Sequence, residues 1–287
     1  MIGDVVGAPG LDVLERRLPV LVKENSADFV VVNGENAAEG FGLTLPHLER
    51  IIAAGADVVS SGNHVWEKRE FWPALNSDGR ILRPLNYPND ECPGCGWVHV
   101  QKPSLKAGKE ISWLVVNLQG REFMTAIDCP FKAFDKLKTE IDNPGPSVGK
   151  QPPVDKLQLS NELPIENAII LVDFHAESTR EKEALAYHLD GRASVVAGTH
   201  THVQTADERI LPKGTAYITD LGMTGTLDGI IGMDPKICID RARNQVLYRM
   251  EVSAPVESGR TAVHGIIVEI DGESQKAVSI KRISVLN

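Results

Sequence analysis

The chain has 287 residues, of which 42% are hydrophobic and 24% are charged, the balance of a globular protein with a sizeable core. Its 39 acidic and 30 basic side chains give a formal net charge of −9. This charge argues against binding of long nucleic acid, which needs a basic surface, but a local cation could still hold a small anionic substrate.

The sequence contains no segment that predicts insertion into a membrane. Its apolar runs are shorter than the roughly 18 residues that a membrane-spanning helix requires. The N-terminus lacks the basic start and the apolar core of a signal peptide. Four cysteines are too few and too scattered for a disulfide scaffold. We therefore expect a cytoplasmic protein that does not associate with a membrane.

The first half of the chain alternates strands and helices. Residues 28–33 form a short, β-branched apolar run that predicts a strand. Apolar residues then recur at helical spacing from 44 or 45 to 54, and Gly55 ends this predicted helix. A second strand is predicted at 56–60, followed by a helix near 66–75. Short, continuously apolar strands separated by helices indicate an α/β sheet that is buried on both faces.

The second half repeats this pattern. Strands are predicted at 113–117, 168–173 and 193–197, and a shorter one at 217–219. Residues 179–189 predict a helix with Arg180, Glu181, Lys182 and Glu183 on its solvent side. The whole chain therefore has the element order of an α/β protein.

Two further segments bear on the organisation of the chain. Residues 262–270 and 277–286 alternate like the strands of a hairpin, joined by a turn at Asp271 and Gly272. Residues 141–164 are rich in proline among polar residues and predict an irregular surface insertion. We expect one domain spanning residues 1–287, with this insertion at its surface.

Side chains that can bind metal ions follow the ends of the predicted strands. In α/β sheets the carboxyl ends of the strands face the ligand crevice, so distant parts of the chain converge there. The candidate metal ligands at these positions are Asp4, Glu35, Asn36, Asn63, His175, His200 and His202.

Histidines are concentrated in the same turns. His200 and His202 are separated by one residue, a spacing that is common by chance but that can place two imidazoles beside a pair of ions. His175 follows another strand, and His64 follows Asn63. Four of the eight histidines thus lie at strand ends, which is not expected of histidines that merely satisfy hydrogen bonds in a core.

The candidate ligands form a mixed set of nitrogen and oxygen donors. Such a set suits Fe, Mn or Zn better than Ca or Mg, and without a thiolate it is not a structural zinc cage. Two ions roughly 3.5–4 Å apart would lower the pKa of a bridging water and neutralise charge on a phosphate. His64 would then either donate a proton to the leaving group or make a supporting hydrogen bond.

These residues resemble the calcineurin-like metallophosphoesterases, and most closely their YmdB-type bacterial phosphodiesterase branch. The similar segments cover most of the chain in the right order. They are Gly3-Asp4-Val5-Val6-Gly7, Asn33-Gly34-Glu35-Asn36, Gly62-Asn63-His64-Val65-Trp66, Asp173-Phe174-His175-Ala176-Glu177, the run from Gly198 to Asp207, Gly222-Met223-Thr224-Gly225 and the run from Gly229 to Asp234.

The resemblance implies a four-layer α/β/β/α sandwich and a di-metal centre, often iron, with manganese able to support activity. It implies that Asp4, Glu35, Asn36 and His202 hold one ion. It implies that Glu35, Asn63, His175 and His200 hold the other, with His64 as proton donor. Val6 stands where the wider superfamily has a histidine, and the resemblance implies that Asn36 completes that shell instead.

The implied activity is hydrolysis of small cyclic phosphodiesters, namely 2′,3′- and 3′,5′-cyclic nucleotides, through a hydroxide that bridges the metals. Two alternatives stay open. The same site could act on phosphomonoesters, as a nucleotidase or phosphoprotein phosphatase does, or the chain could be a regulator that binds metal and nucleotide with negligible turnover. A homo-oligomer is compatible with the sequence.

Overall fold

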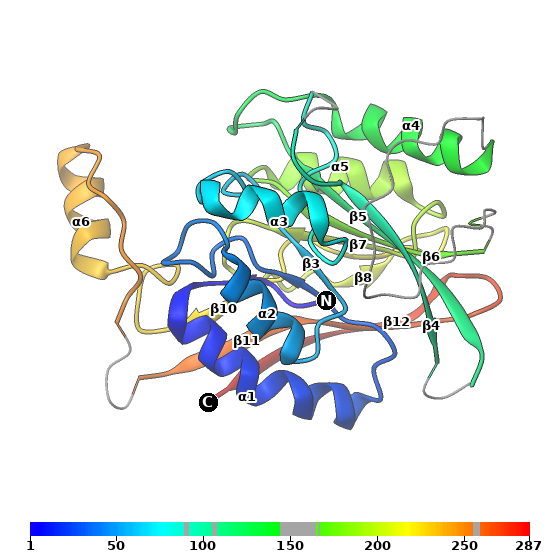
Figure 1. Ribbon diagram of the computed structural model, residues 1–287, viewed down its shortest axis with the longest axis horizontal. Coiled ribbons are helices and arrows are strands. Elements are labelled where there is room, and N and C mark those ends of the chain that lie inside the picture. The colour runs from blue at the N-terminus through cyan, green and yellow to red at the C-terminus, as the bar shows by residue number, and fades with distance from the viewer. Residues whose placement is uncertain (89–91, 105–107, 144–164, 166, 255–258) are drawn as a thin grey trace.

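The computed structural model describes residues 1–88, 92–104, 108–143, 165, 167–254 and 259–287. Within them the chain forms two β-sheets and helices that lie on their outer faces (Figure 1). None of the described helices is long and apolar enough to cross a membrane.

The first sheet combines the amino-terminal strands with the carboxyl-terminal hairpin. Its hydrogen-bonded order is β1-β10-β11-β12, and β2 pairs in parallel with β3. Bridges from Ile2 to Val32 and to Gly265 connect the two groups. The strands are β1 (Asp4–Val5), β2 (Val31–Asn33), β3 (Val58–Ser60), β10 (Met223–Thr226), β11 (Thr261–Ile270) and β12 (Ala277–Leu286).

The second sheet has six strands in the order β4-β5-β6-β7-β9-β8. The central strands β5, β6, β7 and β9 run parallel, whereas β4 and β8 pair antiparallel at the edges. The strands are β4 (Trp97–Pro103), β5 (Glu110–Gln119), β6 (Ile169–His175), β7 (Val195–Thr199), β8 (Arg209–Ile210) and β9 (Ala216–Ile218). The seven residues of β6 are all buried, as expected for a central parallel strand.

Three apolar cores separate four layers. One core, which includes Leu14, Ile51 and Leu75, joins the first sheet to the helices outside it. These are α1 (Gly7–Asn25), α2 (Leu45–Ala53) and α3 (Trp72–Ser77), the last preceded by the 3₁₀ helix η1 (Arg69–Phe71).

The other two cores complete the stack. A second core, with Phe134 and Leu185, joins the other sheet to α4 (Pro130–Asp142) and α5 (Thr179–Leu189). The third lies between the sheets and contains Val31, Val58 and Val195. Helix, sheet, sheet and helix layers therefore follow one another, and the expected four-layer α/β/β/α sandwich is confirmed.

One helix does not belong to these layers. Helix α6 (Pro235–Asn244) stands apart from both sheets in Figure 1, and none of its residues is buried. Its amino-terminal end is capped by Asp234, whose Oδ1 accepts a hydrogen bond of 2.9 Å from the amide of Ile237. The chain between the end of α6 and residue 250 returns toward the body of the molecule.

Most predicted elements form within a few residues of their expected bounds. The helix predicted at 179–189 is confirmed as α5, and the predicted hairpin is confirmed as β11 and β12. The placement of Glu181 and Lys182 on the solvent side of this helix is wrong, because both side chains are buried in contacts with distant segments. The helix predicted near 66–75 is instead a 3₁₀ helix, η1, from Arg69 followed by α3, which ends at Ser77. Of the predicted insertion, residues 141 and 142 belong to α4, and 144–164 lie outside the described residues.

Candidate metal centre

The strand ends of both sheets bring the candidate ligands together. Glu35 and Asn36 lie in the turn after β2, Asn63 in the turn after β3, and His200 directly after β7. His175 is the last residue of β6. Asp4 departs from the expectation, because it opens β1, paired with Met223, instead of following a strand.

His175 is the point at which four candidate ligands meet. Its Nε2 atom lies 2.9 Å from Oε1 of Glu35, 3.0 Å from Oδ1 of Asn63 and 2.9 Å from Nδ1 of His200. A ring nitrogen carries at most one proton, so it cannot satisfy three neighbouring lone pairs. Donor atoms of Glu35, His175 and His200 all lie within 4.8 Å of one another. Such convergence suits a cation held between these side chains.

A second group of donors lies around Asp4. The Oδ1 atom of Asp4 is buried without a hydrogen-bond partner among the described residues, and so is Oδ1 of Asn36. The other Asp4 oxygen accepts a hydrogen bond of 3.3 Å from the amide of His200. Oδ1 of Asp4 also lies 3.8 Å from Nδ1 of His175. A buried oxygen without a hydrogen-bond partner costs free energy, which a bound cation would offset.

Hydrogen bonds select the ring nitrogen that each histidine can offer to a metal. Nδ1 of His202 lies 2.9 Å from the carbonyl oxygen of Ile231 and must donate to it, which leaves Nε2 with a lone pair. Nδ1 of His175 lies 3.0 Å from the hydroxyl of Thr199, so its Nε2 faces the other ligands. Nε2 of His200 lies 3.2 Å from Glu177, which leaves Nδ1 toward His175.

Acidic side chains flank His175 in the sequence, but they do not both act on its ring. Glu177 contacts His200. Asp173 acts on His175 through Thr199, whose hydroxyl donates to Oδ1 of Asp173 at 2.7 Å.

The pKa values of His175 and His200 shift in opposite directions. Burial alone would lower the pKa of His175, but the carboxylates of Glu35, Asp4 and Asp173 outweigh burial and raise this pKa to about 9. Burial and the neighbouring His175 lower the pKa of His200 to about 3. Of two imidazoles in contact, only one is protonated when no metal is bound.

The pKa values of the two buried carboxylates, Glu35 and Asp4, also shift in opposite directions. Burial would raise the pKa of Glu35, but His175, together with His64 and His200, outweighs it and lowers this pKa to about 2. Burial raises the pKa of Asp4 to about 6, although His202 and His175 oppose the shift. Carboxylates that are buried in this way are stabilised by a bound cation.

A side chain at position 62 would collide with two of the candidate ligands. A Cβ atom there would lie 2.2 Å from a ring carbon of His175 and 2.4 Å from Oε2 of Glu35. The turn that carries Asn63 can therefore approach these two side chains only if residue 62 is glycine.

His64 lies at the rim of this group of ligands. Its backbone amide donates to Oε2 of Glu35 at 3.2 Å, which ties its position to the candidate ligands. Its ring packs edge-on against Phe41, with the ring centroids 4.9 Å apart. Nδ1 lies 3.4 Å from Glu67, and the side chain is 24% exposed. The imidazole is therefore accessible to a molecule that binds beside the candidate ligands.

Two buried side chains support the site and were not identified from the sequence. Lys182 of α5 and Asp220 are 1% and 0% exposed, and Nζ lies 2.6 Å from Oδ2. The same oxygen accepts hydrogen bonds from the amide and the hydroxyl of Thr201, at 3.1 and 2.8 Å. Thr201 lies between His200 and His202, both of which have positive φ angles, of 101° and 64°.

This network therefore stabilises the turn that presents both histidines. The sequence held a signal for one of its members, because Asp220 directly follows the predicted strand at 217–219. Nothing in the sequence distinguishes Lys182 from the charged residues around it on the predicted helix.

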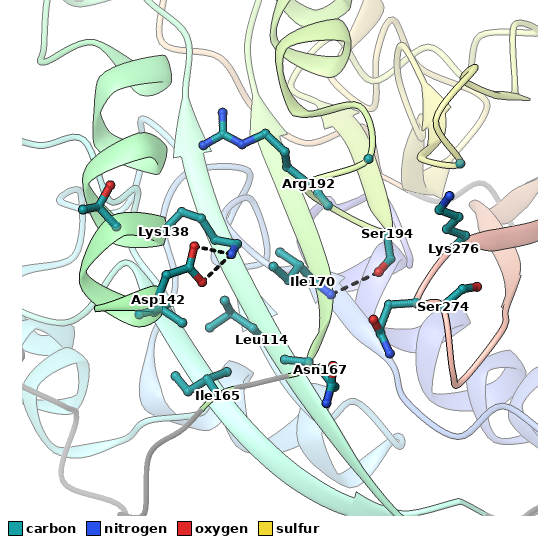
Figure 2. Close-up of a pocket in the computed structure, with 17 residues that line it drawn as sticks. Leu114, Lys138, Asp142, Ile165, Asn167, Ile170, Arg192, Ser194, Ser274 and Lys276 are labelled. Carbon is teal, nitrogen blue, oxygen red and sulfur yellow. Dashed lines mark hydrogen bonds and ion pairs between the residues drawn. The ribbon is translucent and has the colours of Figure 1, made fainter. Parts of the chain in front are cut away.

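The cavity shown in Figure 2 is not part of this site. It has a volume of about 630 Å³ and lies by the amino-terminal parts of β6 and β7, where Ile170 donates to the hydroxyl of Ser194 (Figure 2). An ion pair between Lys138 and Asp142 borders it. Because the candidate ligands lie at the opposite, carboxyl-terminal ends of these strands, the cavity has no connection with the metal centre.

Known proteins with this sequence pattern and fold cover nearly the whole chain. The family model described as "YmdB-like protein" matches residues 1–283. A 2′,3′-cyclic-nucleotide 2′-phosphodiesterase of Bacillus subtilis (strain 168) is 43% identical over 284 residues, which are 99% of this chain and 95% of that protein.

Two crystal structures have the same fold. A hypothetical protein from Thermus thermophilus is 36% identical, with a TM-score of 0.79 over 99% of this chain and 97% of the other. A protein from Mycoplasma pneumoniae described as a novel phosphatase is 29% identical, also with a TM-score of 0.79, over 99% of this chain and 92% of the other. The chain belongs to the YmdB-like family.

Proposed function

We propose that this chain is a metal-dependent phosphodiesterase that hydrolyses cyclic nucleotides, with 2′,3′-cyclic nucleotides as its main substrates and 3′,5′-cyclic nucleotides as a second class. The observation that carries the proposal is the contact of three donor atoms with Nε2 of His175. The 43% identity to a 2′,3′-cyclic-nucleotide 2′-phosphodiesterase supports the choice of substrate.

We assign the ligands by the contacts of their donor atoms. Glu35, Asn63, His175 and His200 would hold one ion, through the atoms that meet at His175. Asp4, Asn36 and His202, with Glu35 shared, would hold the other. The unpartnered oxygens of Asp4 and Asn36 support the second assignment. This nitrogen and oxygen donor set suits iron, with manganese or zinc as replacements.

Bound metal ions would neutralise phosphate charge and make a water molecule nucleophilic near neutral pH. The protein's own contribution is to place a proton donor beside the candidate ligands. We assign this role to His64, which the amide contact with Glu35 holds beside the ligands. In a 2′,3′-cyclic phosphate, water adds to phosphorus while the bond from phosphorus to one ribose oxygen breaks. His64 gives that oxygen its proton and regains one from solvent.

The first experiment measures hydrolysis of 2′,3′-cyclic AMP before and after removal of metal by a chelator, and again after addition of Mn²⁺ or Fe²⁺. We expect turnover to disappear with the chelator and to return with metal. The ratio of this turnover to that of p-nitrophenyl phosphate separates a diesterase from a monoesterase. An enzyme that hydrolyses only the monoester, or a metal-loaded protein that hydrolyses neither compound, refutes the proposal.

We also propose that residues 1–287 act as a single catalytic unit. Both sheets contribute ligands, since Asp4, Glu35 and Asn63 come from strands or turns of the first sheet and His175 and His200 from the second. Separate production of the two halves should therefore yield fragments with no metal-dependent turnover, which the same assay measures.

A further inference from the structure

A second cavity opens beside His64, and none of the candidate metal ligands lines it. It has a volume of about 530 Å³, within the range of cavities that bind small molecules. The turn at residues 38–41 and residues 64–68 form one wall. Arg241 of α6 and residues 248–250, which return from this helix, form the other. Helix α6 stands apart from the layers in Figure 1, and through Arg241 it contributes to the lining of this cavity.

The charge of this cavity differs from that of the whole protein. Lys68, Arg241 and Arg249 line it, against two carboxylates, Glu39 and Glu67. It is therefore basic on a chain whose formal net charge is −9. A basic cavity beside a candidate phosphoesterase site favours an anionic ligand.

The carboxylates are already engaged by other groups. Glu39 lies 3.3 Å from Lys68 and 4.0 Å from Arg249. Glu67 is paired with His64. Arg241 has no carboxylate within ion-pair distance among the described residues, and its guanidinium donates to the carbonyl oxygen of Tyr248 at 3.4 Å. Its remaining donors can therefore bind a phosphate, for which a guanidinium is well suited.

Aromatic side chains lie among these charges. The ring of Phe41 packs against His64, and Tyr248 lines the same cavity with 40% of its surface exposed. An exposed tyrosine beside arginines offers a stacking surface for a nucleobase. Base stacking and phosphate binding are thus available on one side of the proposed proton donor.

We infer that this cavity binds a nucleoside that carries a second phosphate, in addition to the cyclic phosphate at the metal centre. The inference rests on the proposed function and extends it to a substrate class. The second phosphate has two sources: the 5′-phosphate of a cyclic mononucleotide, or the last internucleotide phosphate of a short oligoribonucleotide that ends in a 2′,3′-cyclic phosphate. Arg241 and Arg249 are the groups that recognise it.

The experiment compares kcat/KM for 2′,3′-cyclic AMP, its 5′-phosphorylated form, and ApA with a terminal 2′,3′-cyclic phosphate. The matched variants are Arg241→Gln and Arg243→Gln, because Arg243 lies on the same helix but does not line the cavity. We expect the wild type to prefer the substrates with a second phosphate by about tenfold, the value of one charge-assisted hydrogen bond. R241Q should lose that preference through KM, with kcat unchanged, whereas R243Q should keep it.

The two longer substrates identify the source of the phosphate. An equal gain in kcat/KM for both substrates indicates that the cavity recognises a phosphate at the 5′ position whatever group it carries. A gain for only one assigns the cavity to that source. A wild type without preference, or R241Q and R243Q variants that behave alike, overturns the inference while leaving the proposed function intact.

A binding measurement keeps the two proposals distinguishable. Titration calorimetry with adenosine 3′,5′-bisphosphate and 3′-AMP needs no turnover. If no diester is hydrolysed, the proposed function fails, and the calorimetry still decides on the cavity. A tenfold weaker binding of the bisphosphate by R241Q, with binding of 3′-AMP unchanged, supports the second phosphate site. Equal affinities of the wild type for the two ligands contradict it.

Discussion

Replacement of Lys182 by methionine tests the buried network beneath the His200-Thr201-His202 turn. Methionine has a similar length and preserves packing, but it leaves Asp220 as a buried charge without its cation. The Coulomb attraction across 2.6 Å is about 6 kcal/mol at an effective dielectric constant of about 20. Hydrogen bonds from Thr201 and Gly222 remain with Asp220 and retain part of its stabilisation. We therefore expect Lys182→Met to lower the free energy of unfolding by about 3–5 kcal/mol, as is typical when one partner of a buried ion pair is removed.

The assay is urea unfolding of the metal-free protein, which separates folding from metal binding. The control is Lys138→Met, which removes an exposed pair with Asp142 four residues away on α4. That pair should contribute about 0.3–0.5 kcal/mol. The double variant with Asp220→Asn should recover part of the loss, since the unpaired charge is gone. A loss from Lys182→Met no larger than that of the control would refute the reasoning.

The other predictions concern the metal centre. His64→Ala should reduce turnover by about 10²–10⁴-fold while metal content, measured by mass spectrometry, stays unchanged; loss of metal would instead make His64 a ligand. Gly62→Ala should abolish metal binding in a folded protein, because its Cβ would collide with His175 and Glu35, whereas Gly225→Ala, with no contact below 3.4 Å, should bind metal normally. Metal uptake at pH 7 should release a proton from His175, because its pKa of about 9 keeps it protonated in the metal-free protein, so affinity should rise with pH up to about 9. Indicator-dye titration measures this release, and uptake without a proton would contradict the assignment.

The sequence indicated the elements that bear most of the candidate ligands because strands buried on both faces are short apolar runs with polar ends. Strands β6 and β7 and helix α5 follow this rule closely. Helix α6 was not predicted, because none of its residues is buried and only Cys238 packs against a small apolar cluster. Strand β1 spans only two residues and is defined by its pairing with β10, which lies far along the chain.

The candidate residues could be selected from the sequence because metal-binding side chains are chemically distinct and recur at strand ends. The contacts that these residues make with one another could not be predicted in this way. That Glu177 contacts His200 instead of its closer sequence neighbour His175 depends on how β6 and β7 lie side by side. The choice of ring nitrogen at His202 depends on the carbonyl of Ile231, in a distant loop.

The sequence by itself thus determined the α/β class, the family resemblance and the set of candidate ligands, since periodicity and side-chain chemistry are local properties. Only the tertiary structure decided which donors meet at His175, why Lys182 is buried against Asp220, and that Arg241 of α6 lines a basic cavity beside His64. These features depend on contacts between residues far apart in the chain, and their strength comes from burial. Neither periodicity nor composition specifies these distant contacts or the burial that strengthens them.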